Sequence, residues 1–173
     1  MAQQFSRLIA LGCMVLLIAT PILSLYYLIN IERFAALAQG NLGLSIQWQT
    51  VTGFQWYSLW LLTFLHIAVG LAGLFFLRRA FSNFAKGQLF NPRNSRDFRL
   101  FAILLFAQAL AKPLHFSISS VLLSLNHPAG QKLLSVSVGS DEVSGIALAM
   151  MLWVVSDLLV KGGQLESENK QFI

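Results

Sequence analysis

Four long apolar runs, separated by polar segments, dominate the pattern of the chain. They cover residues 8–29, 57–77, 100–125 and 143–160. At a rise of about 1.5 Å per residue, each run is long enough for a helix that crosses a hydrocarbon core of about 30 Å. The pattern therefore predicts an all-α membrane protein: a single domain, residues 1–173, built as a bundle of four transmembrane helices.

Composition agrees with a membrane protein and narrows the chemistry. Apolar residues make up 56% of the 173 and charged residues only 11%, against about 25% charged in soluble domains. The single cysteine, Cys13, excludes a disulfide within the chain. The sequence has no cysteine and histidine set with metal-binding spacing, no glycine-rich phosphate loop and no nucleophile-base arrangement. We therefore expect neither an enzyme nor a bound cofactor or metal.

The first run is expected to remain in the protein as a transmembrane helix. Its apolar stretch is longer than that of a cleaved signal peptide, and only Arg7 precedes it as a basic residue. Ala36-Leu37-Ala38 has the form of a cleavage site but lies too far beyond the run. Cys13 follows almost no apolar segment, so a lipoprotein signal is not expected either.

The distribution of lysine and arginine predicts the orientation. Nine of the 12 basic residues lie before the first run, after the last run, or between the second and third runs in residues 78–99. The other side holds only Arg33 and Lys132. Cytoplasmic segments carry the excess of such residues, so we expect a multi-pass bacterial inner-membrane protein with both termini in the cytoplasm. The net charge of +5 then serves orientation and contact with anionic lipid, and no direct nucleic-acid binding is expected.

This orientation makes 30–56 and 126–142 outer loops and 161–173 a cytosolic tail. Polar and apolar residues alternate in Leu42–Trp48, beyond its glycine, and in Leu134–Val138. Because alternation with a period of two is typical of half-buried strands, these segments predict a small two-stranded extracytoplasmic cap. Irregular loop structure is the alternative.

The two halves of the chain resemble each other. A shift of 92 positions places Arg7 on Arg99 and Pro21 on Pro113. Each proline removes a backbone donor inside its helix, which predicts a kink in the first and third spans. We interpret the likeness as an internal repeat of two tandem helical hairpins, with chance matching among apolar residues as the alternative.

The third run carries a polar stripe. Gln108, Lys112, His115 and Ser119 are spaced 4, 3 and 4 residues apart, which places them on one face of a helix. His66 lies at a similar depth in the second run, so the two histidines are expected to be able to meet. A lysine inside a span usually faces the bundle interior or a wet cavity. Three interpretations compete: hydrogen bonds that fix helix packing, a polar cavity of a small transporter or of an ion or proton conductor, and a haem ligated by both histidines.

On the predicted inner side, the second helix is expected to continue to about Lys86 and to stop at Gly87, a typical helix-ending residue. The phenylalanine and basic side chains of this extension suit a lipid interface. Asn91-Pro92 predicts a turn, and Ser95 is the expected N-cap of the third span.

Two polar segments on that side carry a family resemblance. They read Phe84-Ala-Lys-Gly-Gln-Leu-Phe-Asn91 and Gly162-Gly-Gln-Leu-Glu-Ser-Glu-Asn169. With the four-span layout, which covers nearly the whole chain, they resemble the bacterial membrane proteins of domain-of-unknown-function family 2975. The ending Gln171-Phe172-Ile173 departs mildly from the family, and Lys112 has no place in the family pattern.

The resemblance implies no established activity, but it implies a partner. Members are often encoded beside a short helix-turn-helix regulator, which implies a membrane protein that holds or releases a cytosolic DNA-binding protein. Lipid contact and solubility are the alternative role of the two segments, and self-association is left open. The candidate contact residues are Lys86, Gly87, Asn91, Arg93, Arg96, Glu166, Glu168 and Asn169.

Overall fold

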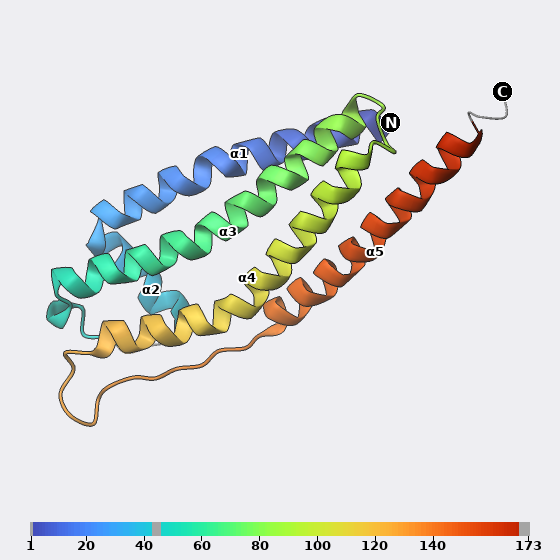
Figure 1. Ribbon diagram of the computed structural model, residues 1–173. Coiled ribbons are helices and arrows are strands. Elements are labelled where there is room, and N and C mark those ends of the chain that lie inside the picture. The colour runs from blue at the N-terminus through green and yellow to red at the C-terminus, as the bar shows by residue number, and fades with distance from the viewer. Residues whose placement is uncertain (1, 43–45, 170–173) are drawn as a thin grey trace.

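The structure is a computed structural model that describes residues 2–42 and 46–169 (Figure 1). Within these ranges every regular element is a helix. The elements are α1 (Ala2–Ile29), α2 (Ile31–Leu42), the 3-10 turn η1 (Trp48–Thr50), α3 (Gly53–Ala85), α4 (Pro92–Ser124) and α5 (Ser140–Asn169). Four of them, α1, α3, α4 and α5, are long and apolar enough to cross a membrane. The predicted all-α bundle is confirmed, and the chain is a multi-pass membrane protein with four candidate spans.

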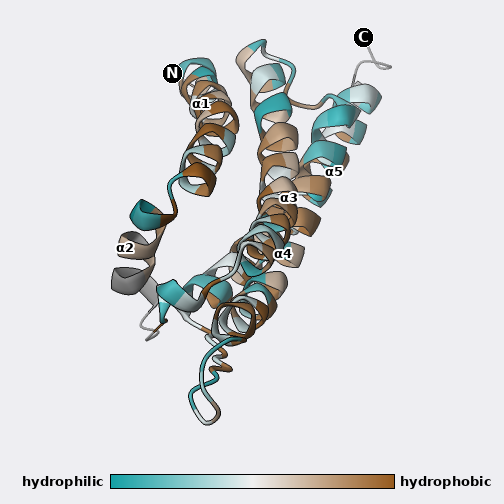
Figure 2. Cartoon of the chain, turned by 90° about the vertical axis from the view of Figure 1, so that its left-hand side faces the viewer, coloured by the Kyte–Doolittle hydropathy of each residue, from teal (hydrophilic) through white to brown (hydrophobic). Residues whose placement is uncertain are grey.

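The four long helices pack side by side in chain order. α1 packs on α3, α3 on α4, and α4 on α5, while α1 and α5 lie at opposite edges of the bundle (Figures 1 and 2). The start of α1, the α3–α4 connection and the end of α5 share one end of the bundle, here called the terminal face. The opposite end, with α2, η1 and the α4–α5 loop, is called the loop face. Hydrophilic residues gather at the terminal ends of α1 and α5 (Figure 2).

Apolar side chains point outward along the spans. On α1, Leu8 is 64% exposed and Val15 is 62% exposed. On α5, Met151 is 64% exposed and Leu158 is 60% exposed. Such continuous apolar surface is unfavourable in water and favourable in hydrocarbon, so the outward faces of the bundle fit lipid.

In the α3–α4 connection, α3 ends where the sequence predicted, but α4 begins earlier than predicted. α3 ends at Ala85, and Gly87 has φ +79°, the left-handed conformation that glycine adopts at little cost. α4 then begins at Pro92 and not near Ser95. The Asn91 side chain accepts a hydrogen bond from the Arg93 N–H at 3.0 Å, so Asn91 is the N-cap. The prediction of Ser95 was wrong because proline, which has no N–H and a fixed φ, suits the first position of a helix.

The predicted strand cap was also wrong. No strand is found among the described residues of either loop at the loop face, and residues 43–45 of the first segment lie outside the description. The backbone N–H groups of Leu133 and Ser135 donate to the hydroxyls of Ser124 and Ser120 on α4, at 2.9 and 3.0 Å. The second segment therefore runs extended along α4, and serine hydroxyls take the place of a partner strand.

The two loops at the loop face still meet, through side chains. The Gln47 N–H donates to His127 Nε2 at 3.1 Å, and the Gln47 amide donates to the Gln131 side chain at 3.0 Å. Beneath them lies an aromatic core in which Phe34 of α2 packs edge-on against Trp56 of α3 at 5.3 Å between ring centroids. α2 was not predicted, and it covers this core from the loop face.

The two prolines lie inside their helices as the sequence places them, Pro21 in α1 and Pro113 in α4. α4 changes direction in its yellow segment (Figure 1), as a missing backbone hydrogen bond inside a helix allows. The internal repeat of two hairpins remains a prediction.

Candidate functional site

The two segments of the terminal face that carry the family resemblance lie against each other. A Cβ atom at Gly162 of α5 would collide with the Phe90 ring, and one at Gly163 would lie 3.3 Å from the Phe90 carbonyl oxygen. A larger residue at either position would therefore have to displace the Phe90 ring or shift the backbone beside it. A groove of about 660 Å³ opens between the segments, lined by Gly87, Gln88, Leu89, Phe90, Asn91, Pro92 and Glu166.

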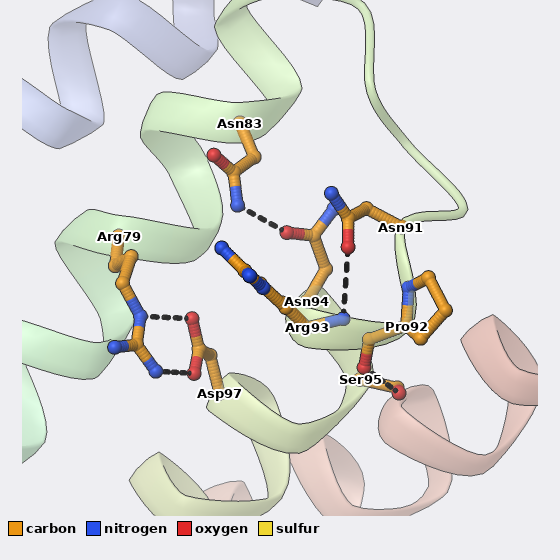
Figure 3. A network of polar contacts seen from close by, with 8 residues as sticks. All are labelled: Arg79, Asn83, Asn91, Pro92, Arg93, Asn94, Ser95 and Asp97. Carbon is orange, nitrogen blue, oxygen red and sulfur yellow. Dashed lines mark hydrogen bonds and ion pairs between the residues drawn. The ribbon is translucent and has the colours of Figure 1, made fainter.

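A polar network holds the α3–α4 side of this groove (Figure 3). The buried Asn94 accepts a hydrogen bond from the Asn83 amide at 2.8 Å. Its own amide donates to the carbonyls of Gln88 and Leu89, at 2.6 and 3.0 Å. One side chain thus fixes the backbone of the groove wall to both helices.

The second part of the network is an ion pair. Arg79 of α3 binds Asp97 of α4 through two contacts, with Nε to Oδ2 at 2.6 Å (Figure 3). The Asp97 side chain is fully buried, whereas that of Arg79 is 38% exposed. The sequence reasoning missed Asp97 and Asn94. The signal was present, since Asp97 is the only acidic residue between Arg78 and Arg99.

The remaining predicted contact residues lie on the two segments that form this groove or directly beside them in sequence. Lys86, Arg93 and Arg96 are exposed on the α3–α4 side, and Glu166 and Glu168 are exposed on α5. Asn169 is the last residue of α5. The structure therefore places basic and acidic candidates on the same end of the molecule, with the groove between them.

Arg99 joins the same end of α4 to α5. It binds Asp157 at 2.6 Å and lies over the Trp153 ring at 5.4 Å from the centroid. The Ser156 hydroxyl donates to the Ser95 carbonyl at 2.9 Å, in a buried contact. The middle of α5 is thus held to the start of α4 by charge and by hydrogen bonding.

The polar stripe of α4 is divided in the structure. Gln108 and His115 face α3, where the His115 ring lies 5.1 Å from that of His66 between centroids. The expected meeting of the two histidines is confirmed. Ser119 donates to the His115 carbonyl of its own helix at 2.7 Å. Lys112 turns toward α5 instead.

Lys112 is an exposed residue in an ion cluster, not a lysine of the bundle interior. Its Nζ lies 2.8 Å from Glu142 and 3.4 Å from Asp141, and its side chain is 49% exposed. The lysine was expected to face the bundle interior or a wet cavity. It does not face the interior, because the α4–α5 loop runs back along α4 and brings the acidic first turn of α5 beside Lys112. It does line a partly polar pocket of about 360 Å³ together with His115 and Asp141, so the wet cavity remains a prediction.

The histidine geometry does not fit a haem held by both rings. A porphyrin ligated on both sides would have to lie between the two imidazoles and separate α3 from α4. The rings instead contact each other directly, tilted by 34°. His115 Nε2 is also already 3.1 Å from the Thr63 hydroxyl.

Replacing Lys112 with methionine is expected to lower the melting temperature of the purified protein by a few degrees. The Glu142 side chain, only 7% exposed, would lose its ammonium partner. Circular dichroism in detergent measures the change, with Lys161→Met as the matched control on exposed α5 surface. The double variant Lys112→Met, Glu142→Gln should regain most of the loss. Equal melting of the single variant and the native protein would contradict the role of the cluster.

Comparison of the chain with family models, with curated proteins and with solved structures found no match. The function of the chain is therefore argued from the groove of the terminal face and from the chemistry that it can support.

Proposed function

We propose that this chain is a non-enzymatic membrane protein of regulatory or interaction type, whose terminal face binds a cytosolic protein. The observation that carries the proposal is the contact between residues 86–92 and 162–166. These segments are far apart in sequence, yet they form one groove with fixed walls. The family resemblance suggests the partner, a small helix-turn-helix regulator.

The chemistry of the groove suits a protein partner. Apolar side chains are exposed beside it, with Phe90 at 38% and Leu165 at 61%. The basic residues Arg93 and Arg96 lie on the same end of the molecule. Apolar anchors with a charged rim are typical of protein interfaces. A partner segment with apolar side chains and charges of both signs would complement these apolar residues, the arginines and the acidic Glu166 and Glu168 of α5.

The proposal includes the location of the chain. We place it in the bacterial inner membrane with the terminal face in the cytoplasm. The support is the excess of lysine and arginine in residues 78–99 and around the termini, which is the charge pattern of cytoplasmic segments. A protease added to sealed, right-side-out vesicles should then spare a tag placed after the last residue.

Co-purification tests the proposed function. The tagged protein and the helix-turn-helix protein encoded beside it should be isolated together from membranes. Gly162→Val should reduce the recovered partner at least about tenfold, because the added side chain pushes Phe90 and α5 apart. Gly12→Val on α1 is the matched control, since its Cβ meets no atom within 4 Å. Absence of the partner from the native preparation, in detergent and in membranes, would sink the proposal.

The alternative function, a small transporter or conductance built on Lys112, draws less support. A transport site needs a charge that can meet the transported species. Lys112 is already bound by Glu142 and Asp141. If Lys112→Met changes ion flux into loaded liposomes, that alternative regains its support.

A further inference from the structure

A second groove, separate from the terminal face, lies between α3 and α4 in the middle of the bundle. Its volume is about 280 Å³, near the lower end of the range for small-ligand pockets. Apolar side chains form most of its wall. Three of the residues that line it carry polar side chains: His66 of α3, and Gln108 and His115 of α4.

The groove opens to the surface that fits lipid. Leu65 and Leu114, which line it, are 62% and 65% exposed. His66 lies 13 residues along α3 from Arg79, or about 20 Å, and six residues from Trp60, or about 9 Å. The three polar side chains thus sit at the depth of the hydrocarbon, where a polar group without a partner costs several kcal/mol.

The hydrogen-bonding capacity of the groove can be counted. The Thr63 hydroxyl has one proton, which it donates to the Leu59 carbonyl at 2.8 Å. Its oxygen must therefore accept from His115 Nε2 at 3.1 Å, which leaves His115 Nδ1 as an acceptor when the ring is neutral. No described residue forms a hydrogen bond with the His66 ring or the Gln108 amide.

Gln108 is held in the groove by a close approach of the two helices. A Cβ atom at Gly70 of α3 would lie 2.7 Å from Gln108 Nε2. The amide therefore lies directly on the α3 backbone, in a groove that His66 and His115 also line. The groove offers donors from His66 and Gln108 and an acceptor from His115.

We propose that this groove binds a membrane-dissolved quinone or its quinol. Such a molecule is planar, dissolves in hydrocarbon, and carries ring oxygens that accept hydrogen bonds as a quinone and also donate them as a quinol. Of the described residues that line the groove, none is charged, so an anionic headgroup finds no counter-ion there. The volume admits one ring system, and the apolar tail stays in lipid. This binding site is independent of the proposed partner at the terminal face.

The experiment uses the native protein in phosphatidylcholine nanodiscs, titrated with a short-chain ubiquinone and with its quinol. Quenching of tryptophan fluorescence reports binding, because Trp60 lies on the same helix as His66. Saturable quenching above that of empty nanodiscs is expected. His66→Leu and Gln108→Leu should each weaken binding about tenfold, the loss expected for one hydrogen bond in a site without water.

Two further variants make the test decisive. Ser119→Ala should bind as the native protein does, since its hydroxyl serves only its own helix. Leu65→Phe should narrow the groove from the lipid side while leaving all three polar side chains in place and adding no tryptophan to the signal. Non-saturable quenching of the native protein would overturn the proposal, and so would equal affinity of the native protein and the Leu65→Phe and Gln108→Leu variants.

Discussion

Replacing Arg79 with leucine is expected to lower the free energy of unfolding by about 3 kcal/mol. The Asp97 carboxylate is fully buried, and Arg79 is its ion-pair partner. Without the guanidinium, the carboxylate would keep its desolvation cost and lose its compensation. Removing one partner of a buried pair typically costs about 3 to 5 kcal/mol. Because Arg79 itself is 38% exposed, solvent screens part of the interaction and the low end applies.

Unfolding by a denaturing detergent, followed by circular dichroism, measures this change. Arg78→Leu is the matched control, because among the described residues this neighbouring arginine donates a hydrogen bond only to the Met14 sulfur, at 3.9 Å. The double variant Arg79→Leu, Asp97→Leu should be more stable than Arg79→Leu alone, since no buried charge remains. If Arg78→Leu and Arg79→Leu destabilise equally, loss of positive charge explains the effect, and the pair does not.

Replacing Gln55 with leucine is expected to have a similar effect at the loop face, about 3 kcal/mol. Gln55 is 2% exposed and links three segments. Its oxygen accepts from the Thr52 N–H at 2.8 Å, which caps the start of α3, and from the Asn126 amide at 2.8 Å. Its amide donates to the Leu122 carbonyl at 2.7 Å. Leucine has a similar size but would leave these buried groups without partners.

The same unfolding measurement applies, with Gln49→Leu as its control. Gln49 is exposed in η1, so the same chemical change there should alter the free energy of unfolding by less than about 0.5 kcal/mol. A Gln55 variant as stable as the Gln49 variant would show that water replaces the lost hydrogen bonds.

The sequence predicted the features that depend on local composition. Long apolar runs identified four spans because a helix is the element that satisfies its own backbone in lipid. The helix stop at Gly87 followed from backbone conformation, and the meeting of His66 and His115 followed from their matching depth. Each of these inferences depends only on residues that are nearby in sequence, or on the position of a residue along its span.

The errors concern choices that local pattern leaves open. Ser95 and Asn91 are both good N-caps, and the preference for Asn91 depended on the proline that follows it. Leu134–Val138 does alternate as a strand does, but its hydrogen bonds go to Ser120 and Ser124 of a helix. Hydropathy indicates which residues are removed from water, but it does not indicate which residues they contact.

The prediction for Lys112 was limited in the same way, because the sequence does not show which segment packs beside it. Its spacing placed it on one face with Gln108 and His115, which was correct for the helix. The segment that packs beside Lys112 depends on a distant part of the chain. The α4–α5 loop returns along α4, so that α5 begins beside Lys112. The groove at the terminal face likewise depends on Gly162 and Phe90, which are distant in sequence.

The packing of each long helix on its predecessor also bears on how the protein is made. α3 finds its partner α1 already synthesised, α4 finds α3, and α5 finds α4. After α1, no long helix depends for its first packing contacts on a segment that is synthesised later. Contacts between successive segments form fastest, so we expect assembly to advance one helix at a time during insertion. A chain halted after α4 should already hold the Arg79–Asp97 pair, whereas the terminal-face groove can form only when α5 arrives.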